Sequence, residues 1–60
     1  MYKITIKRKN TKETIAIINY CYVVKENDEI ALMFDKNNNY IGIVNLLSNE
    51  IEIEEQKGGA

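Results

Sequence analysis

Hydrophobic and polar residues alternate along most of this 60-residue chain, a pattern that predicts extended strands. In the first such segment, YKITIKRK, the apolar side chains fall on one face and the basic side chains mostly on the other. Polar turns separate this segment from four similar ones. We place the strands at residues 2–9, 14–25, 29–35, 40–46 and 50–55.

The connections are short and rich in turn-forming residues. Asn10–Glu13 has the length of a hairpin turn, and Asn27 with Asp28 forms the next turn. DKNNN, residues 35–39, is the clearest turn, because asparagine tolerates the left-handed backbone that tight hairpins need. A helix is the main rival for residues 41–50, but Gly42 and the β-branched residues limit it to one turn.

These segments predict an all-β protein of one domain. We expect a small antiparallel five-stranded barrel or meander of SH3-like size, with at most one short helical turn before the last strand. The domain spans residues 1–56 and residues 57–60 form a disordered tail. The closing letters QKGGA offer nothing that could pack, so this end is expected to fray.

The basic first segment and the acidic last segment are complementary. Lys3 and Lys7 lie on the outer face of the first, and alternate glutamates from Glu50 to Glu54 lie on the outer face of the last. If the two strands are neighbours, opposite charges meet outside while isoleucines meet inside. We therefore expect these strands to pair and to close the sheet, with the charges fixing the register.

The second segment, TIAIINYCYVV, is apolar on both faces, which is unusual for so short a chain. One interpretation is a bend or bulge near Asn19 that exchanges the inward set partway along the strand. Another is an ordinary surface patch. The third is an interface, since a 60-residue domain buries only roughly 60% of its unfolded surface and is often stabilised by a partner.

We favour the interface interpretation, most simply as a homodimer with twofold symmetry. Each exposed aliphatic side chain forgoes about 1.5–3 kcal/mol of burial. That is a large share of a total stability of about 5 kcal/mol. The expected interface consists of Ile15, Ile17, Asn19, Cys21, Val23 and Met33.

A second hypothesis assigns the basic N-terminal hairpin to nucleic acid or a nucleotide, with the tyrosines stacking on bases. A formal net charge of −1 weakens this hypothesis, because nucleic-acid binders are normally basic. The residues of this alternative patch are Lys3, Lys7, Arg8, Lys9 and Lys12.

Composition argues against most catalytic chemistry. The absence of histidine excludes a Ser-His-Asp or Cys-His centre, and the lone Cys21 lies mid-strand as a small hydrophobic residue. The loop that starts at Asp35 has ligands at three calcium positions, but Tyr40 replaces the essential glycine and Leu46 the bidentate glutamate. We expect no catalytic residue, no cofactor and no metal.

The remaining features indicate a cytoplasmic protein that binds proteins. The chain has one cysteine, no export signal and no apolar run near the roughly 18 residues of a membrane span. Abundant isoleucine, lysine and asparagine suggest an AT-rich phage or mobile-element genome. We expect a non-enzymatic accessory module that inhibits or modulates a host protein by steric binding.

Overall fold

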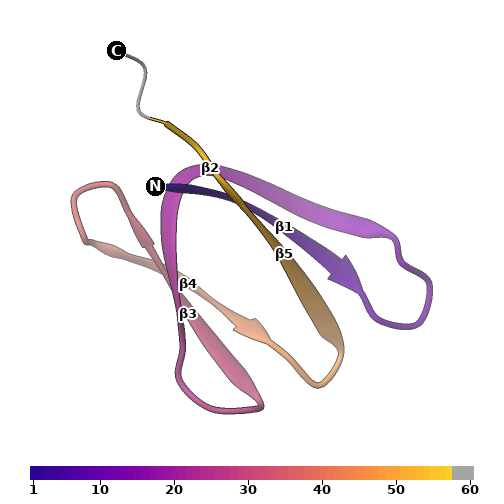
Figure 1. Ribbon diagram of the computed structural model, residues 1–60. Coiled ribbons are helices and arrows are strands. Elements are labelled where there is room, and N and C mark those ends of the chain that lie inside the picture. The colour runs from indigo at the N-terminus through magenta and orange to yellow at the C-terminus, as the bar shows by residue number, and fades with distance from the viewer. Residues whose placement is uncertain (58–60) are drawn as a thin grey trace.

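Five antiparallel strands form one sheet in a computed structural model that describes residues 1–57 (Figure 1). Of the predicted tail at 57–60, residues 58–60 lie outside the described residues. The strands are Tyr2–Arg8 (β1), Thr14–Lys25 (β2), Ile30–Asp35 (β3), Tyr40–Asn45 (β4) and Asn49–Glu55 (β5).

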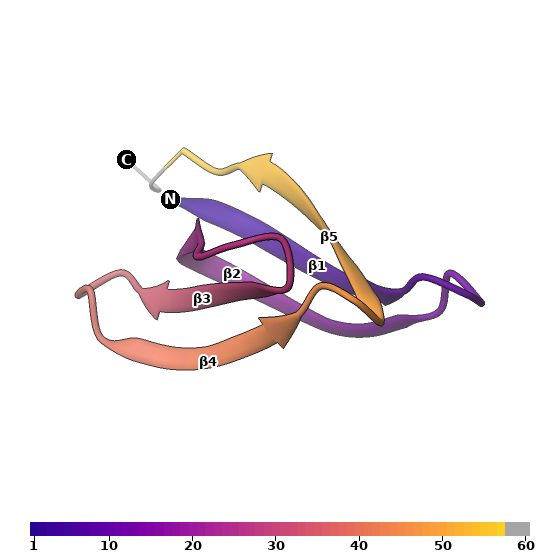
Figure 2. The ribbon, with the colours of Figure 1, turned by 90° about the horizontal axis from the view of Figure 1, so that it is seen from below.

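The strand order is β4-β3-β2-β1-β5, so four consecutive strands form a meander and β5 returns to lie beside β1. Figure 2 shows β4 and β5 at opposite sides of the curved sheet, and these two strands are its edges. The predicted all-β class with five antiparallel strands is confirmed, whereas the sheet is open and does not form a closed barrel.

No helical turn precedes β5. Residues 46–48 form a turn in place of the short helix allowed by the sequence, and residues 1–57 contain no helix. The described part of the chain accordingly offers no helix of the length and hydrophobicity needed to cross a lipid bilayer.

The predicted pairing of the first and last strands is confirmed. Ile4 lies opposite Ile53 and Ile6 opposite Ile51, while Lys7 lies opposite Glu50. This pairing does not close the sheet, because within residues 1–57 no strand pairs with the other edge of β5. Ile53, expected to face inward, therefore remains 52% exposed at the edge.

Strand β2 bends near its middle, as one of the three interpretations predicted. Tyr20 has a φ of 54°, in the left-handed region, and β2 contains one residue more than β1 between the pairs Tyr2–Cys21 and Ile4–Ile18. Residues 14–18 of β2 pair with β1, residues 22–25 pair with β3, and Cys21 between them pairs with both strands (Figure 1). The extra residue changes which alternate side chains point inward.

The side chain of Gln56 holds this bend in place. Its Oε1 accepts a hydrogen bond of 2.9 Å from the Tyr20 backbone N–H, and its Nε2 donates to Asn19 Oδ1 at 3.1 Å. The Gln56 backbone N–H also donates to the Met1 carbonyl at 2.9 Å. The expectation of a fraying chain end is wrong for this residue, which joins both ends of the domain.

The core lies between the two parts of the sheet that the bend creates. Its fully buried members come from the first four strands, and Ile51 of β5 packs against them. Gly42 belongs to the same region, because a Cβ atom there would lie 3.3 Å from Met33 Cε. The buried residues are Ile4, Ile6, Cys21, Ala31, Met33 and Val44.

Polar side chains shape the turns as their sequence predicted. The Asp35 carboxylate accepts hydrogen bonds from the backbone N–H groups of Asn37 at 2.8 Å and Asn39 at 2.9 Å. Asn27 Oδ1 accepts in the same way from Ile30 at 3.0 Å. These local bonds replace ladder bonds where the chain reverses.

We predict that the left-handed backbone at residue 20 can be detected by substitution. Tyr20→Asn should have a free energy of unfolding about 1 kcal/mol greater than Tyr20→Val, because asparagine tolerates this conformation and β-branched residues do not. Urea unfolding measures the difference. At Tyr22, which has no positive φ, the same two substitutions should rank in the opposite order. If the asparagine and valine variants had the same order of stability at both positions, the left-handed backbone assigned to Tyr20 would be contradicted.

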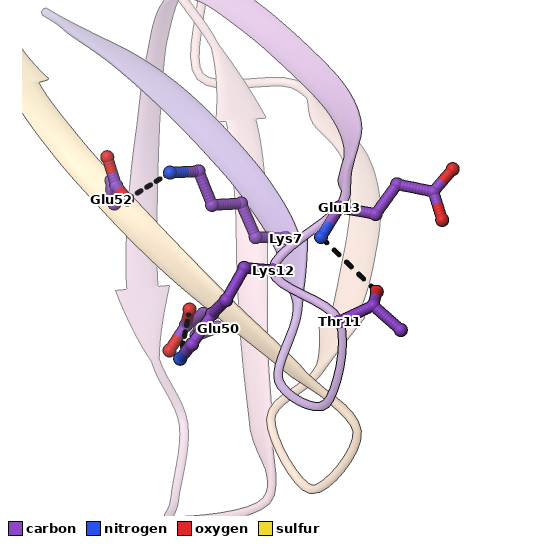
Figure 3. A network of polar contacts seen from close by, with 6 residues as sticks. All are labelled: Lys7, Thr11, Lys12, Glu13, Glu50 and Glu52. Carbon is purple, nitrogen blue, oxygen red and sulfur yellow. Dashed lines mark hydrogen bonds and ion pairs between the residues drawn. The ribbon is translucent and has the colours of Figure 1, made fainter.

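A second prediction concerns acid stability. The backbone N–H of Asn39, followed by that of Asn37, holds the pKa of Asp35 below its ordinary value. A depressed pKa stabilises the fold above the ordinary value of 3.8, and this contribution is lost as the pH falls through the folded-state pKa. Asp35→Asn should therefore flatten the fall in urea midpoint below about pH 4. Glu13→Gln, with a side chain that points to solvent (Figure 3), should not.

Candidate protein-binding surface

The two parts of the sheet carry different outer surfaces. We call β5, β1 and residues 14–18 of β2 the charged half, and residues 21–25 of β2 with β3 and β4 the apolar half. On the apolar half the strand register aligns outward side chains in two rows across three strands. One row is Tyr22, Phe34 and Tyr40, and the other is Val24, Leu32 and Ile43.

These six residues form the outer apolar face, and none of them is charged. Val24 is 51% exposed, Tyr40 59% and Ile43 55%, while the side chains of β3 between them are half-buried. The rings of Phe34 and Tyr40 contact edge to face with centroids 6.2 Å apart. A contiguous apolar surface rich in aromatic side chains is typical of the core of a protein interface.

A shallow hollow continues this face at the end of β4. It has a volume of about 310 Å³, and Leu47 on its wall is 65% exposed. Its apolar wall, formed by Ile30, Ile43 and Leu47, could receive an aliphatic side chain of a partner. The lining residues are Glu29, Ile30, Ile43, Asn45 and Leu47.

The interface residues expected from the sequence do not share one surface. Ile15 and Ile17 lie exposed on the charged half, and Asn19 is exposed beside Gln56. Cys21 and Met33 are buried, and Val23 packs against the core. Cys21 and Met33 are thus core residues of the single chain, and we leave both out of the surface.

Sequence reasoning missed the outward set of Tyr22 and Val24. Strict alternation groups them with Ala16 and Ile18, which face inward. The bend at Tyr20 breaks that grouping, and the only signal of it in the sequence is that both alternate sets of β2 are apolar.

Glutamates of β5 neutralise much of the positive charge of the basic hairpin. Lys7 Nζ lies 2.6 Å from Glu52 Oε1 and Lys12 Nζ lies 2.9 Å from Glu50 Oε1 (Figure 3). Lys3 lies opposite Glu54 in the register of β1 and β5. Of the alternative nucleic-acid patch, Arg8 and Lys9 also lie on the hairpin and are exposed.

The residues considered for catalysis or metal binding are placed as structural groups. Burial raises the pKa of the Cys21 thiol, which disfavours the reactive thiolate. Both oxygens of Asp35 accept hydrogen bonds within the hairpin turn, the reading favoured over a calcium loop. Within residues 1–57, no group of three or more acidic, cysteine or histidine side chains is close enough to hold a metal ion.

Comparison of the chain with models of known protein families, with curated proteins and with solved structures finds no match. The candidate surface therefore stands on its geometry.

We predict that Glu52, and not Glu54, is the glutamate that controls the pKa of Lys7. The hydrogen bond to Glu52, with the charge of that carboxylate, raises the pKa of Lys7 above 10.5. Glu52→Gln should lower the Lys7 pKa, measured by NMR of the side-chain amine. Because a raised lysine pKa stabilises the fold below 10.5 and this is lost above it, the stability gap between wild type and variant should close at higher pH. Glu54→Gln on the same strand is the control, and an equal shift there would argue against the pair.

Proposed function

We propose that the chain is a non-enzymatic protein-binding module that acts through the outer apolar face. The observation that supports this most is the neutral grid of Tyr22, Phe34, Tyr40, Val24, Leu32 and Ile43 on one side of the sheet. Burial of such side chains drives association, and aromatic residues at the centre of a patch are the usual energetic hot spots.

The proposed mode of action is steric. A rigid sheet face that covers a surface of another protein blocks whatever else would bind there, and this needs no reactive group. The composition suggests a phage or mobile element, so we propose a host protein in the cytoplasm as the target and inhibition or modulation as the result. Charged residues at the rim, such as Glu29, would set orientation and the rate of encounter.

The alternative is a nucleic-acid binder that uses the basic hairpin. Its support is the exposure of Arg8 and Lys9, while Lys7 and Lys12 are engaged by glutamates. If this alternative holds, the chain should retard oligonucleotides with an affinity that falls log-linearly with salt, and Lys7→Glu with Arg8→Glu should abolish retardation.

We predict that cross-linking will locate the binding surface. Ile43 and Ile17 are matched positions, because they are the same residue type and are 55% and 54% exposed on different halves of the sheet. A photoreactive phenylalanine analogue at residue 43 should form covalent adducts with protein in cells that produce the chain. The same analogue at residue 17 should form few.

Mass spectrometry of the adducts identifies what is bound. Adducts from residue 43 to any protein, including another copy of the chain, support the module. Absence of protein adducts from residue 43, or equal adducts from both positions, would refute the outer apolar face as the binding surface.

A further inference from the structure

We infer that the outer apolar face packs against the same face of a second copy, about a twofold axis that lies between the two sheets and runs across the strands. This inference rests on the proposed function: the second copy occupies the face in the free protein, and a host target would have to displace it. The resulting dimer is a sandwich with its two sheets about 10 Å apart and their strands within about 30° of alignment.

Neutrality is the first reason for a second copy. A charge close to the twofold axis would face its own copy, and the six residues of this face carry no charge. The outer surface of the charged half is different, because alternating lysines and glutamates line β1 and β5 there. The apolar half can stack on itself without opposing like charges.

Area is the second reason. An exposed aromatic side chain presents up to roughly 200 Å². By that scale, the exposed parts of the six residues, with Ile30 and Leu47, amount to about 600 Å² per copy. Complete coverage of both faces would bury about 1,200 Å² in total, which is the lower end of specific protein interfaces. Interfaces at this lower end are commonly weak, so we expect a dissociation constant in the micromolar range.

The charges at the two ends of β3 select the orientation. Glu29 lies just before β3, on the wall of the hollow, and Lys36 lies just after it, beyond the row of Tyr22, Phe34 and Tyr40. A twofold axis across the strands places Glu29 of one copy near Lys36 of the other, twice. An axis along the strands would place Glu29 against Glu29 and Lys36 against Lys36, which is unfavourable.

Analytical ultracentrifugation over a wide concentration range tests the dimer. The wild-type chain should change from 7.0 kDa to twice that mass as its concentration rises. Ile43→Lys should weaken association at least about 100-fold, because it buries a charge in the interface. Ile17→Lys, the matched control, should leave association unchanged. Tyr40→Ser is a second interface variant. Because Tyr40 is 59% exposed, this substitution should weaken association while the chain still folds.

A charge exchange tests the orientation. Lys36→Glu alone, or Glu29→Lys alone, should weaken the dimer by about threefold to tenfold through two equivalent rim contacts. The double variant with both substitutions restores opposite charges across the axis and should recover wild-type association. Failure of the double variant to recover would overturn the proposed axis.

The outcomes separate this inference from the proposed function. A wild-type chain that stays at 7.0 kDa at about 1 mM, well above the expected dissociation constant, would overturn the dimer. Cross-links from residue 43 to a different protein would still support the binding module. Equal weakening of association by Ile43→Lys and Ile17→Lys would also overturn the proposed dimer, because the contact between copies would then lie elsewhere.

Discussion

At Tyr20 the backbone of β2 enters the left-handed region, and the side chains that follow reach the face opposite to the one that simple alternation assigns. Cys21 and Val23 consequently turn into the core, while Tyr22 and Val24 turn out to solvent. A non-glycine residue in this conformation is strained by about 1–2 kcal/mol. The bonds from Gln56 to Tyr20 and Asn19 compensate, so a residue 36 positions away maintains the geometry that separates the two halves of the sheet.

The division that follows explains how so short a chain forms a core at all. A flat sheet of this length would bury one face against nothing, whereas the bent sheet lets β1 and β5 oppose β3 and β4 across a small cluster of buried side chains. The number of apolar residues in β2, β3 and β4 exceeds what this cluster can hold. Part of the surplus lies on the outer apolar face and part elsewhere, as at Ile15 and Ile17, so the bend that builds the core also creates the face that we propose for binding.

Sequence reasoning recovers the strands and the pairing of β1 with β5, because alternation with a period of two and complementary charges act locally and in register. It also identifies β2 as unusual, but it does not identify which residues of β2 face outward. The choice depends on one extra residue at Tyr20, where no glycine marks the left-handed backbone, and on a tertiary bond from Gln56. Met33 illustrates the difficulty: alternation separates it from Leu32 and Phe34 without saying which set is buried, and in the structure Met33 lies in the core.

The burial of Cys21 has a practical consequence. Its sulfur is 1% exposed with the rest of the residue and lies 3.6 Å from the carbonyl oxygens of both Tyr2 and Ile18, at the junction of the two halves. A thiol reagent can reach it only while those halves are apart. When the halves reclose faster than the thiol reacts, the rate at which the native chain is alkylated therefore reports the fraction of molecules in which the two halves are apart.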